Sequence, residues 1–203
     1  MKELDIPTEE KIIEAARQIF VKQGLEGARM QDIADLAGVN KALLHYYFRS
    51  KEILFGKVFD HYTKFLFPDL QSVVNADLTV FEKIDSFIDK YISFFQKNPD
   101  LPIFFVGELN KNPQKIINIL ASTDRFQYIQ QFIFQMMLAM QEGKIKQIHP
   151  RHLIMNVVSM CVFPFLARPM MQVVMQLDDA SFNEIIEERK KVVSQFVKDA
   201  LRI

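Results

Sequence analysis

Apolar residues recur along this chain with helical spacing, and no window alternates between apolar and polar residues at period two. The first predicted helix opens at Thr8 and ends at Gly24. A short helix over 30–37 follows, Gly38 supplies a turn, and Asn40 is a good N-cap for the next helix. The pattern therefore predicts an all-α protein that begins with three helices.

The rest of the chain shows the same helical periodicity. Ser50 is expected to cap a longer helix that runs through Phe67 until Pro68 breaks it. Segments rich in Pro, Gly, Asn and Asp separate the later helices, which are predicted over 78–97, 101–110, 113–142, 150–166 and 179–202. Pro164 and Pro169 should kink or split the segment from 150 to 176. We expect two domains, over residues 1–50 and 51–203.

Composition narrows the class of protein. The chain has 203 residues, 49% of them hydrophobic and 25% charged, which argues for a folded globular protein. It carries 25 Lys and Arg against 25 Asp and Glu, so any contact with nucleic acid must come from a local patch.

Three features bear on the compartment. The single cysteine, Cys161, lies in an apolar run and has no partner for an internal disulfide, which indicates a reducing compartment. The N-terminus has no apolar block of the kind that a signal peptide carries. The stretch from Leu153 to Ala167 is too short for the roughly 20 residues of a membrane-spanning helix. We expect a soluble cytoplasmic protein without a membrane partner.

A local basic and aromatic patch stands out within this neutral chain. The stretch GVNKALLHYYFRSK, from Gly38 to Lys51, holds three cations, a histidine and three consecutive aromatic residues, and no acid appears before Glu52. Two short helices joined at Gly38 and preceded by a longer helix are typical of a helix-turn-helix unit. At 100° per residue, the predicted second helix has a packing side with Leu44, Tyr47 and Phe48. The opposite side carries Lys41, Ala42, His45 and Tyr46, with Leu43 at its edge.

The run from Ile12 to Phe55 resembles the N-terminal domain of the TetR family of transcriptional regulators. The resemblance rests on FVKQGLEGARMQDIADLAGVNKALLHYYFRSKEILF, which follows the family's order of glycine, IA-x-x-AGV, polar cap, lysine, aromatic cluster and SKE-x-L. It spans about a quarter of the chain. It implies a three-helix DNA-binding domain followed by a larger helical domain for ligand binding and dimerisation.

Carried over position by position, the resemblance implies roles in DNA binding. Lys41, Ala42 and His45 would sit in the major groove, while Tyr46 and Tyr47 would approach phosphates or sugars. Lys51 would meet a phosphate, and Arg29 would supply a phosphate contact where relatives have Thr or Ser at the start of the second helix. That departure removes an N-cap as well. The predicted DNA-binding residues are Arg29, Lys41, Ala42, Leu43, His45, Tyr46, Tyr47 and Lys51.

Apolar stripes on the later helices have two readings. Ordinary core is one, and a ligand pocket between the helices, implied by the resemblance, is the other. The predicted ligand-binding residues are Tyr62, Phe87, Tyr91, Phe105, Phe132 and Met136. The broad apolar stripe of the last helix, together with the resemblance, implies a homodimer on a palindromic operator. The function implied is a repressor that a small hydrophobic effector releases from double-stranded DNA, although activation stays open.

Two other classes of protein compete with this interpretation. An enzyme or metal protein is disfavoured because His149 and His152 flank Pro150 without an evident third ligand, and no nucleophile stands in a recognisable motif. We therefore expect no catalytic activity, metal or cofactor. A helical protein-interaction module that never touches DNA is the alternative reading.

Overall fold

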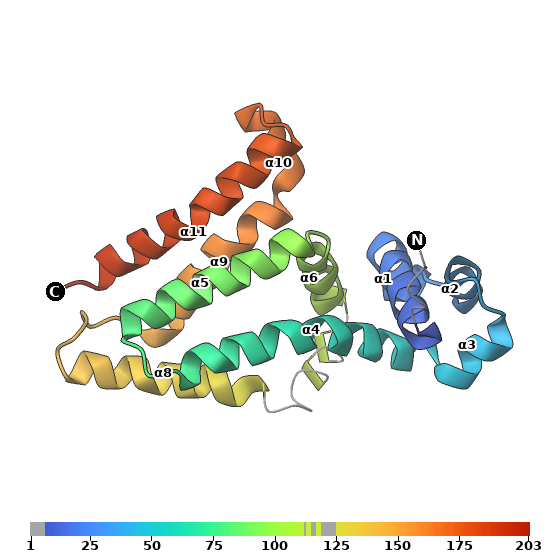
Figure 1. Cartoon of the computed structure of the whole chain (residues 1–203), viewed down its shortest axis with the longest axis horizontal. Coiled ribbons are helices and arrows are strands. Elements are labelled where there is room, and N and C mark those ends of the chain that lie inside the picture. Colours follow the sequence, from blue (N-terminus) through green and yellow to red (C-terminus); the bar gives the residue numbers. More distant parts are fainter. Residues whose placement is uncertain (1–6, 112, 115–116, 119–124) are drawn as a thin grey trace, which may run out of the picture. The chain divides into compact units, whose positions relative to one another are not determined.

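The structure is a computed structural model of the chain and describes residues 7–111, 113–114, 117–118 and 125–203. Helices dominate these ranges and no strand occurs within them, which confirms the all-α prediction. The predicted helix over 113–142 is described only in part, and its residues 115–116 and 119–124 lie outside the described residues. The named helices (Figure 1) are α1 (Thr8–Gly27), α2 (Met30–Ala37), α3 (Lys41–Tyr47), α4 (Lys51–Asn75), α5 (Val80–Lys97), α6 (Leu101–Lys111), α8 (Arg125–Gln141), α9 (Pro150–Leu166), α10 (Arg168–Met175) and α11 (Asp179–Leu201).

The chain forms two compact units. The N-terminal unit comprises Met1–Phe65 and Ile103–Ile119, and the C-terminal unit comprises Leu66–Pro102 and Leu120–Ile203. Helix α4 therefore contributes residues to both units, and so does α6. The predicted domain boundary after residue 50 falls at the start of α4 and stays a prediction.

Aromatic and aliphatic side chains form the core of the N-terminal unit. Helix α1 packs against α2, and α2 packs against α3. Phe20 of α1 meets Phe55 of α4 edge-on, with ring centroids 5.4 Å apart, and Phe55 in turn contacts Phe104 of α6 at 5.3 Å. Phe20 and Phe55 are fully buried. These contacts fix the short helices α2 and α3 against longer ones.

Helix α1 is broken at Gly24, where the sequence predicted its end. Gly24 has a φ of 70° and a ψ of 173°, and a further turn follows it up to Gly27. The next backbone N–H, of Leu25, donates to Oε1 of Glu108 on α6 at 3.0 Å. Glu108 is 2% exposed, so a buried carboxylate accepts the N–H that the break leaves free of the helix.

The prediction that Pro68 ends the fourth helix is wrong, because α4 continues to Asn75. A proline inside a helix costs about 3 kcal/mol. Beyond it, however, Val73 and Val74 are 4% and 6% exposed. Burial of one such side chain contributes about 1.5–3 kcal/mol, so two of them offset the cost of the proline.

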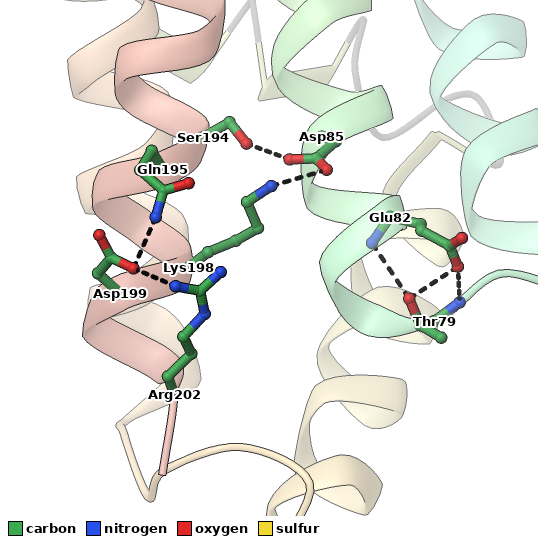
Figure 2. Close-up of polar contacts among 8 residues, drawn as sticks. All are labelled: Thr79, Glu82, Asp85, Ser194, Gln195, Lys198, Asp199 and Arg202. Carbon is green, nitrogen blue, oxygen red and sulfur yellow. Dashed lines mark hydrogen bonds and ion pairs between the residues drawn. The ribbon is translucent and has the colours of Figure 1, made fainter.

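Polar contacts join α5 to α11 in the C-terminal unit. Asp85 of α5 accepts hydrogen bonds from Ser194 and from Lys198 of α11, the latter at 3.0 Å (Figure 2). Helix α5 begins with a capping box in which Thr79 and Glu82 satisfy each other's backbone N–H groups (Figure 2). These contacts fix the register of two long helices that also pack through apolar faces.

The segment from 150 to 176 is split, as its prolines predicted. Helix α9 ends at Leu166, α10 begins at Arg168, and the two are bent by 75°. No single described helix is long and apolar enough to cross a membrane, and this bent pair passes that test only by its combined length and composition.

The apolar stripe of α11 divides into two faces. One face is buried in the C-terminal unit, and its members are Phe182, Ile186, Val193, Val197 and Leu201. The other face is open, with Ile185, Val192 and Phe196 at 40%, 61% and 66% exposed. Met155 and Phe163 of α9 are likewise 64% and 50% exposed. Because α9 packs against α11, the unit presents exposed apolar side chains on two adjoining helices.

Candidate functional site

Two local capping arrangements, one at the end of α2 and one at the start of α3, position helix α3. Gly38 has a φ of 67°, and the N–H of Val39 returns to the Ala34 carbonyl at 3.0 Å, which closes α2. The Asn40 side chain accepts from the backbone N–H of Leu43 at 2.8 Å and opens α3, as predicted. The helix-turn-helix geometry therefore follows from the chemistry of two short stretches.

The two sides of α3 differ in exposure. Leu44 and Phe48 are 0% and 2% exposed, and they anchor the helix in the core. Lys41, Ala42 and His45 are exposed on the other side, as the helical spacing predicted. This side carries a cation, an imidazole and a methyl group, which suit phosphate, base-edge and thymine-methyl contacts respectively.

The two tyrosines next to Phe48 extend the exposed side. Tyr46 is 81% exposed and meets Tyr47 edge-on, with ring centroids 5.6 Å apart. The placement of Tyr47 on the packing side is wrong, because its side chain is 40% exposed and only leans on Phe48 at 6.3 Å. Tyr47 is the last residue of α3, where the packing partners on one side run out. Both hydroxyls are therefore accessible to a phosphate or sugar.

The two predicted cations outside α3 lie in different surroundings. Arg29 is exposed at the N-cap of α2, which has no side-chain cap, so the expected loss of that cap is confirmed. Lys51 donates from Nζ to the carbonyls of Glu26 at 3.0 Å and Ala28 at 3.1 Å. This tether from α4 to the α1–α2 connection was not predicted. An ammonium has three protons, so one of them is left for a phosphate.

A cavity of about 240 Å³ lies within the C-terminal unit. The hydroxyls of Tyr91 and Tyr128 are the only polar side-chain groups among the described residues that line it. The described residues that line the cavity are Leu66, Phe67, Leu70, Val73 and Val74 of α4, Ile84, Phe87 and Tyr91 of α5, Tyr128, Ile129 and Phe132 of α8, and Leu153, Ile154, Val157 and Val158 of α9. Such a lining suits an apolar molecule.

The structure brings three of the six predicted ligand residues, Phe87, Tyr91 and Phe132, to this cavity. Tyr62 and Phe105 belong to the N-terminal unit instead. The Tyr62 hydroxyl donates to Oε2 of Glu14 at 2.6 Å, and the Phe105 ring packs on Phe59 at 4.7 Å.

Met136, the sixth of these residues, is 1% exposed and is not among the described lining residues of the cavity. Helical spacing placed it on the same stripe as Phe132, but spacing does not separate a core side chain from one that faces a cavity. The assignment of the six as ligand-binding residues stays a prediction.

Tyr91 is the lining residue with the most defined ring position. Its ring stacks on Phe87 at 5.3 Å with an interplanar angle of 20°, and it meets Phe95 edge-on at 5.0 Å. Burial raises the pKa of its hydroxyl, which stays protonated. Within the described part of the chain, no residue forms a hydrogen bond with this hydroxyl.

Lys83 is a buried cation that the sequence reasoning missed. It is 7% exposed, and its Nζ donates to the Val74 carbonyl at 2.8 Å and to Oε1 of Gln135 at 2.9 Å. Gln135 also donates to the Val74 carbonyl, at 3.1 Å. The signal was weak, since Lys83 lies four residues before Phe87, on a side of α5 that also carries Lys90.

Comparison with known proteins supports the helix-turn-helix assignment. Residues 12–58 match the family of bacterial regulatory proteins of the tetR type. The chain is 43% identical over 54 residues to the HTH-type transcriptional repressor NicS of Pseudomonas putida, a match that covers 27% of this chain and 26% of NicS. It is 24% identical over 190 residues to the HTH-type transcriptional regulator RutR of Escherichia coli, covering 92% of this chain and 89% of RutR.

The whole fold also has solved counterparts. The crystal structure of PfmR, a TetR family transcriptional regulator from Thermus thermophilus, superposes with a TM-score of 0.69. The match covers 91% of this chain and 97% of that one at 18% sequence identity. The relatives are transcription regulators, which is consistent with a chain that is not an enzyme.

Proposed function

Because this chain belongs to the TetR family of bacterial transcriptional regulators, with an N-terminal DNA-binding domain, we propose that it is a repressor released from its operator by a small hydrophobic effector. The observation that carries the proposal is the two-sided helix α3, anchored by Leu44 and Phe48 and open at Lys41, Ala42 and His45. An operator-binding protein acts where bacterial DNA lies, so the proposal places the chain in the cytoplasm.

The exposed side of α3 enters the major groove in this proposal. Lys41 and His45 read base edges or phosphates, and Ala42 contacts a thymine methyl. Leu43, 36% exposed, covers an apolar base edge beside them. The phosphates on either side of the groove are bound by Tyr46, Tyr47, Arg29 and the third proton of Lys51.

A homodimer provides two copies of α3. Family members bind operators as dimers. The exposed apolar face of α11, with Val192 and Phe196, and that of α9, with Met155 and Phe163, would be buried in this dimer. Two equivalent recognition helices call for an operator with two-fold symmetry, and each half-site raises the effective concentration for the other.

Effector binding and DNA binding are coupled through α4 in this proposal. The part of α4 from Leu66 onwards belongs to the C-terminal unit and lines the cavity with Leu70, Val73 and Val74. The part from Lys51 to Phe65 belongs to the unit that holds α3. A coupling free energy of about 1–3 kcal/mol would lower operator affinity about 5- to 150-fold.

A gel-shift experiment tests the DNA-binding proposal. The purified chain is titrated onto the DNA upstream of its own gene and onto a genomic fragment library, at two salt concentrations, against a random duplex of equal length. We expect selective binding that weakens with salt. Lys41→Ala should weaken selective binding by about 1–3 kcal/mol if Lys41 contacts a base. If Lys41 contacts a phosphate instead, the slope of log affinity against log salt concentration should fall by about one.

Lys144→Ala is the matched control, since it removes the same charge from an exposed side chain of the C-terminal unit. It should leave the shift unchanged. If Lys41→Ala behaves like Lys144→Ala on a selectively bound fragment, α3 is not the reading helix. If no fragment of the library is bound selectively, the chain is a helical protein-interaction module instead.

A further inference from the structure

We propose that the cavity of the C-terminal unit selects a neutral lipophilic molecule of about ten non-hydrogen atoms, which the Tyr91 hydroxyl orients, and that it rejects the corresponding carboxylate. The inference rests on the proposed function in one respect, namely that the cavity is the effector site. It goes further by naming the chemical class of the effector and the residue that recognises its polar group.

The volume sets the size of the ligand. A cavity of about 150 Å³ lined by Leu, Ile and Phe holds one benzene molecule, with six carbons. The present cavity of about 240 Å³ has room, in proportion, for about ten non-hydrogen atoms. A medium-chain alcohol or a substituted bicyclic compound has this size, whereas a nucleotide or a coenzyme conjugate is far too large.

The lining sets the charge of the ligand. The described lining residues include no Asp, Glu, Lys, Arg or His, and all but two of them are purely hydrocarbon. An ionised carboxylate would lose its hydration there without gaining a cation. Lys83 is the one buried lysine among the described residues. It lies close to the cavity, since Val74, which accepts its hydrogen bond, and the adjacent Ile84 both line the cavity. Lys83 is not among the described lining residues, and two of the three protons of its Nζ go to the Val74 carbonyl and to Gln135.

Tyr91 sets the orientation of the ligand. Its ring is fixed between Phe87 and Phe95, so the hydroxyl has a defined position at the cavity wall. A protonated phenol both donates and accepts, and this one has no partner among the described residues. A hydroxyl or carbonyl group on an otherwise apolar ligand would satisfy it. The unmet hydrogen-bonding capacity of this half-buried tyrosine distinguishes the cavity from a simple packing defect.

The test uses two probes of equal chain length, 1-nonanol and nonanoate. Each is titrated by calorimetry into the purified full-length chain at pH 7, where nonanoate is ionised. We expect nonanol to bind at least about tenfold more tightly than nonanoate. Tyr91→Phe removes one hydroxyl and should weaken nonanol binding about 2- to 13-fold, the range of a net hydrogen bond.

Two control variants separate the causes. Tyr62→Phe removes a hydroxyl that lies outside the cavity, and it should leave nonanol binding unchanged. Ile154→Trp fills the cavity from α9 and should abolish binding of nonanol. Thermal unfolding of each variant shows whether it is folded before the titration.

Several outcomes would overturn the inference. Nonanoate binding as tightly as nonanol would mean that the cavity accepts an anion, and loss of that binding in Lys83→Met would identify its partner. If the affinity for nonanol falls in Tyr128→Phe but not in Tyr91→Phe, the orienting group is Tyr128, and the assignment to Tyr91 is wrong. Binding of neither probe would remove the cavity as a site for this class, while the gel shift would still report on DNA binding independently.

Discussion

Replacing Gly24 by alanine should destabilise the chain more than any other glycine-to-alanine change, because two separate costs fall on this position. Gly24 has a φ of 70° and a ψ of 173°, a backbone conformation that is essentially restricted to glycine. A Cβ there would lie 3.1 Å from Oε1 of Glu108 and 3.2 Å from Nζ of Lys111. The first cost is backbone strain, and the second is displacement of a buried carboxylate from the Leu25 N–H.

Both costs have known magnitudes. Holding a non-glycine residue in this region costs about 1–3 kcal/mol. A hydrogen bond to a charged acceptor contributes about 1.5–3 kcal/mol, and the Glu108 bond is buried. Gly24→Ala should therefore lower the free energy of unfolding by about 2.5–6 kcal/mol, depending on how far Glu108 moves. This is a large fraction of the about 5–15 kcal/mol that stabilises a typical domain.

Two other glycines provide the comparison. Gly38 has a φ of 67° in the left-handed helical region, but a Cβ there would meet nothing within 4 Å. Gly38→Ala should cost only the strain, about 1–2 kcal/mol. Gly56 lies inside α4 with nothing within 4 Å of its added Cβ, so Gly56→Ala should stabilise by about 0.5–1 kcal/mol.

Urea unfolding followed by circular dichroism measures all three variants at one protomer concentration, since the proposed dimerisation would make stability depend on concentration. The expected order of stability is Gly56→Ala, the parent chain, Gly38→Ala and Gly24→Ala. A Gly24→Ala variant no less stable than Gly38→Ala would show that the Glu108 carboxylate contributes nothing at the break in α1. The reasoning from close approach would then be refuted.

Three further predictions concern other parts of the chain. Burial opposes the charge on Glu14, but hydrogen bonds from Arg17, Tyr62 and Gln18 outweigh it and lower the pKa to about 2. This carboxylate therefore stabilises the fold above about pH 4.5 and loses its contribution as the pH falls towards 2. Tyr62→Phe should reduce the stabilisation by Glu14 by only about 1 kcal/mol, since the Glu14 side chain is half-exposed, and urea unfolding at pH 7 and pH 3.5 measures it. Burial raises the pKa of Cys161 to about 12, so a thiol reagent at pH 8 should label the native chain on the order of 100-fold more slowly than the unfolded chain. Phe196→Glu should convert the proposed dimer to a monomer in analytical ultracentrifugation, and an unchanged dimer mass would move the interface away from this face of α11.

The helix-turn-helix was predictable because its signals are local. Asn40 and Ser50 each cap a helix by accepting from an N–H three residues later, so residue type and position suffice to identify them. The predicted helix end at Pro68 was wrong because the signal that decides it is not local. Continuation of α4 depends on burial of Val73 and Val74 against other helices, and no local pattern reports that burial.

Contacts between residues far apart in the sequence could not be predicted, for the same reason. The Glu108 carboxylate meets the Leu25 N–H across 83 residues of sequence, and Lys83 meets Gln135 across 52. The sequence offered an indirect sign only for Glu108, which is the single charged residue between Asp100 and Lys111. A lone charge on an apolar face is costly to bury unless something hydrogen-bonds to it, so it marks a position where a distant polar partner is to be expected.

The two halves of the proposed regulator therefore differ in how sequence encodes them. The helix-turn-helix lies within one continuous stretch, and the side chains of α3 other than Tyr47 are core or surface according to their helical position. The cavity is instead a space that side chains of α4, α5, α8 and α9 leave unfilled, and Met136 and Phe132 share a stripe although only Phe132 lines it. In the proposal, effector specificity would follow from the shape of that unfilled space and from one hydroxyl, that of Tyr91. It follows that close relatives could share an operator and still respond to different molecules, since changing two or three cavity residues alters the ligand without touching α3.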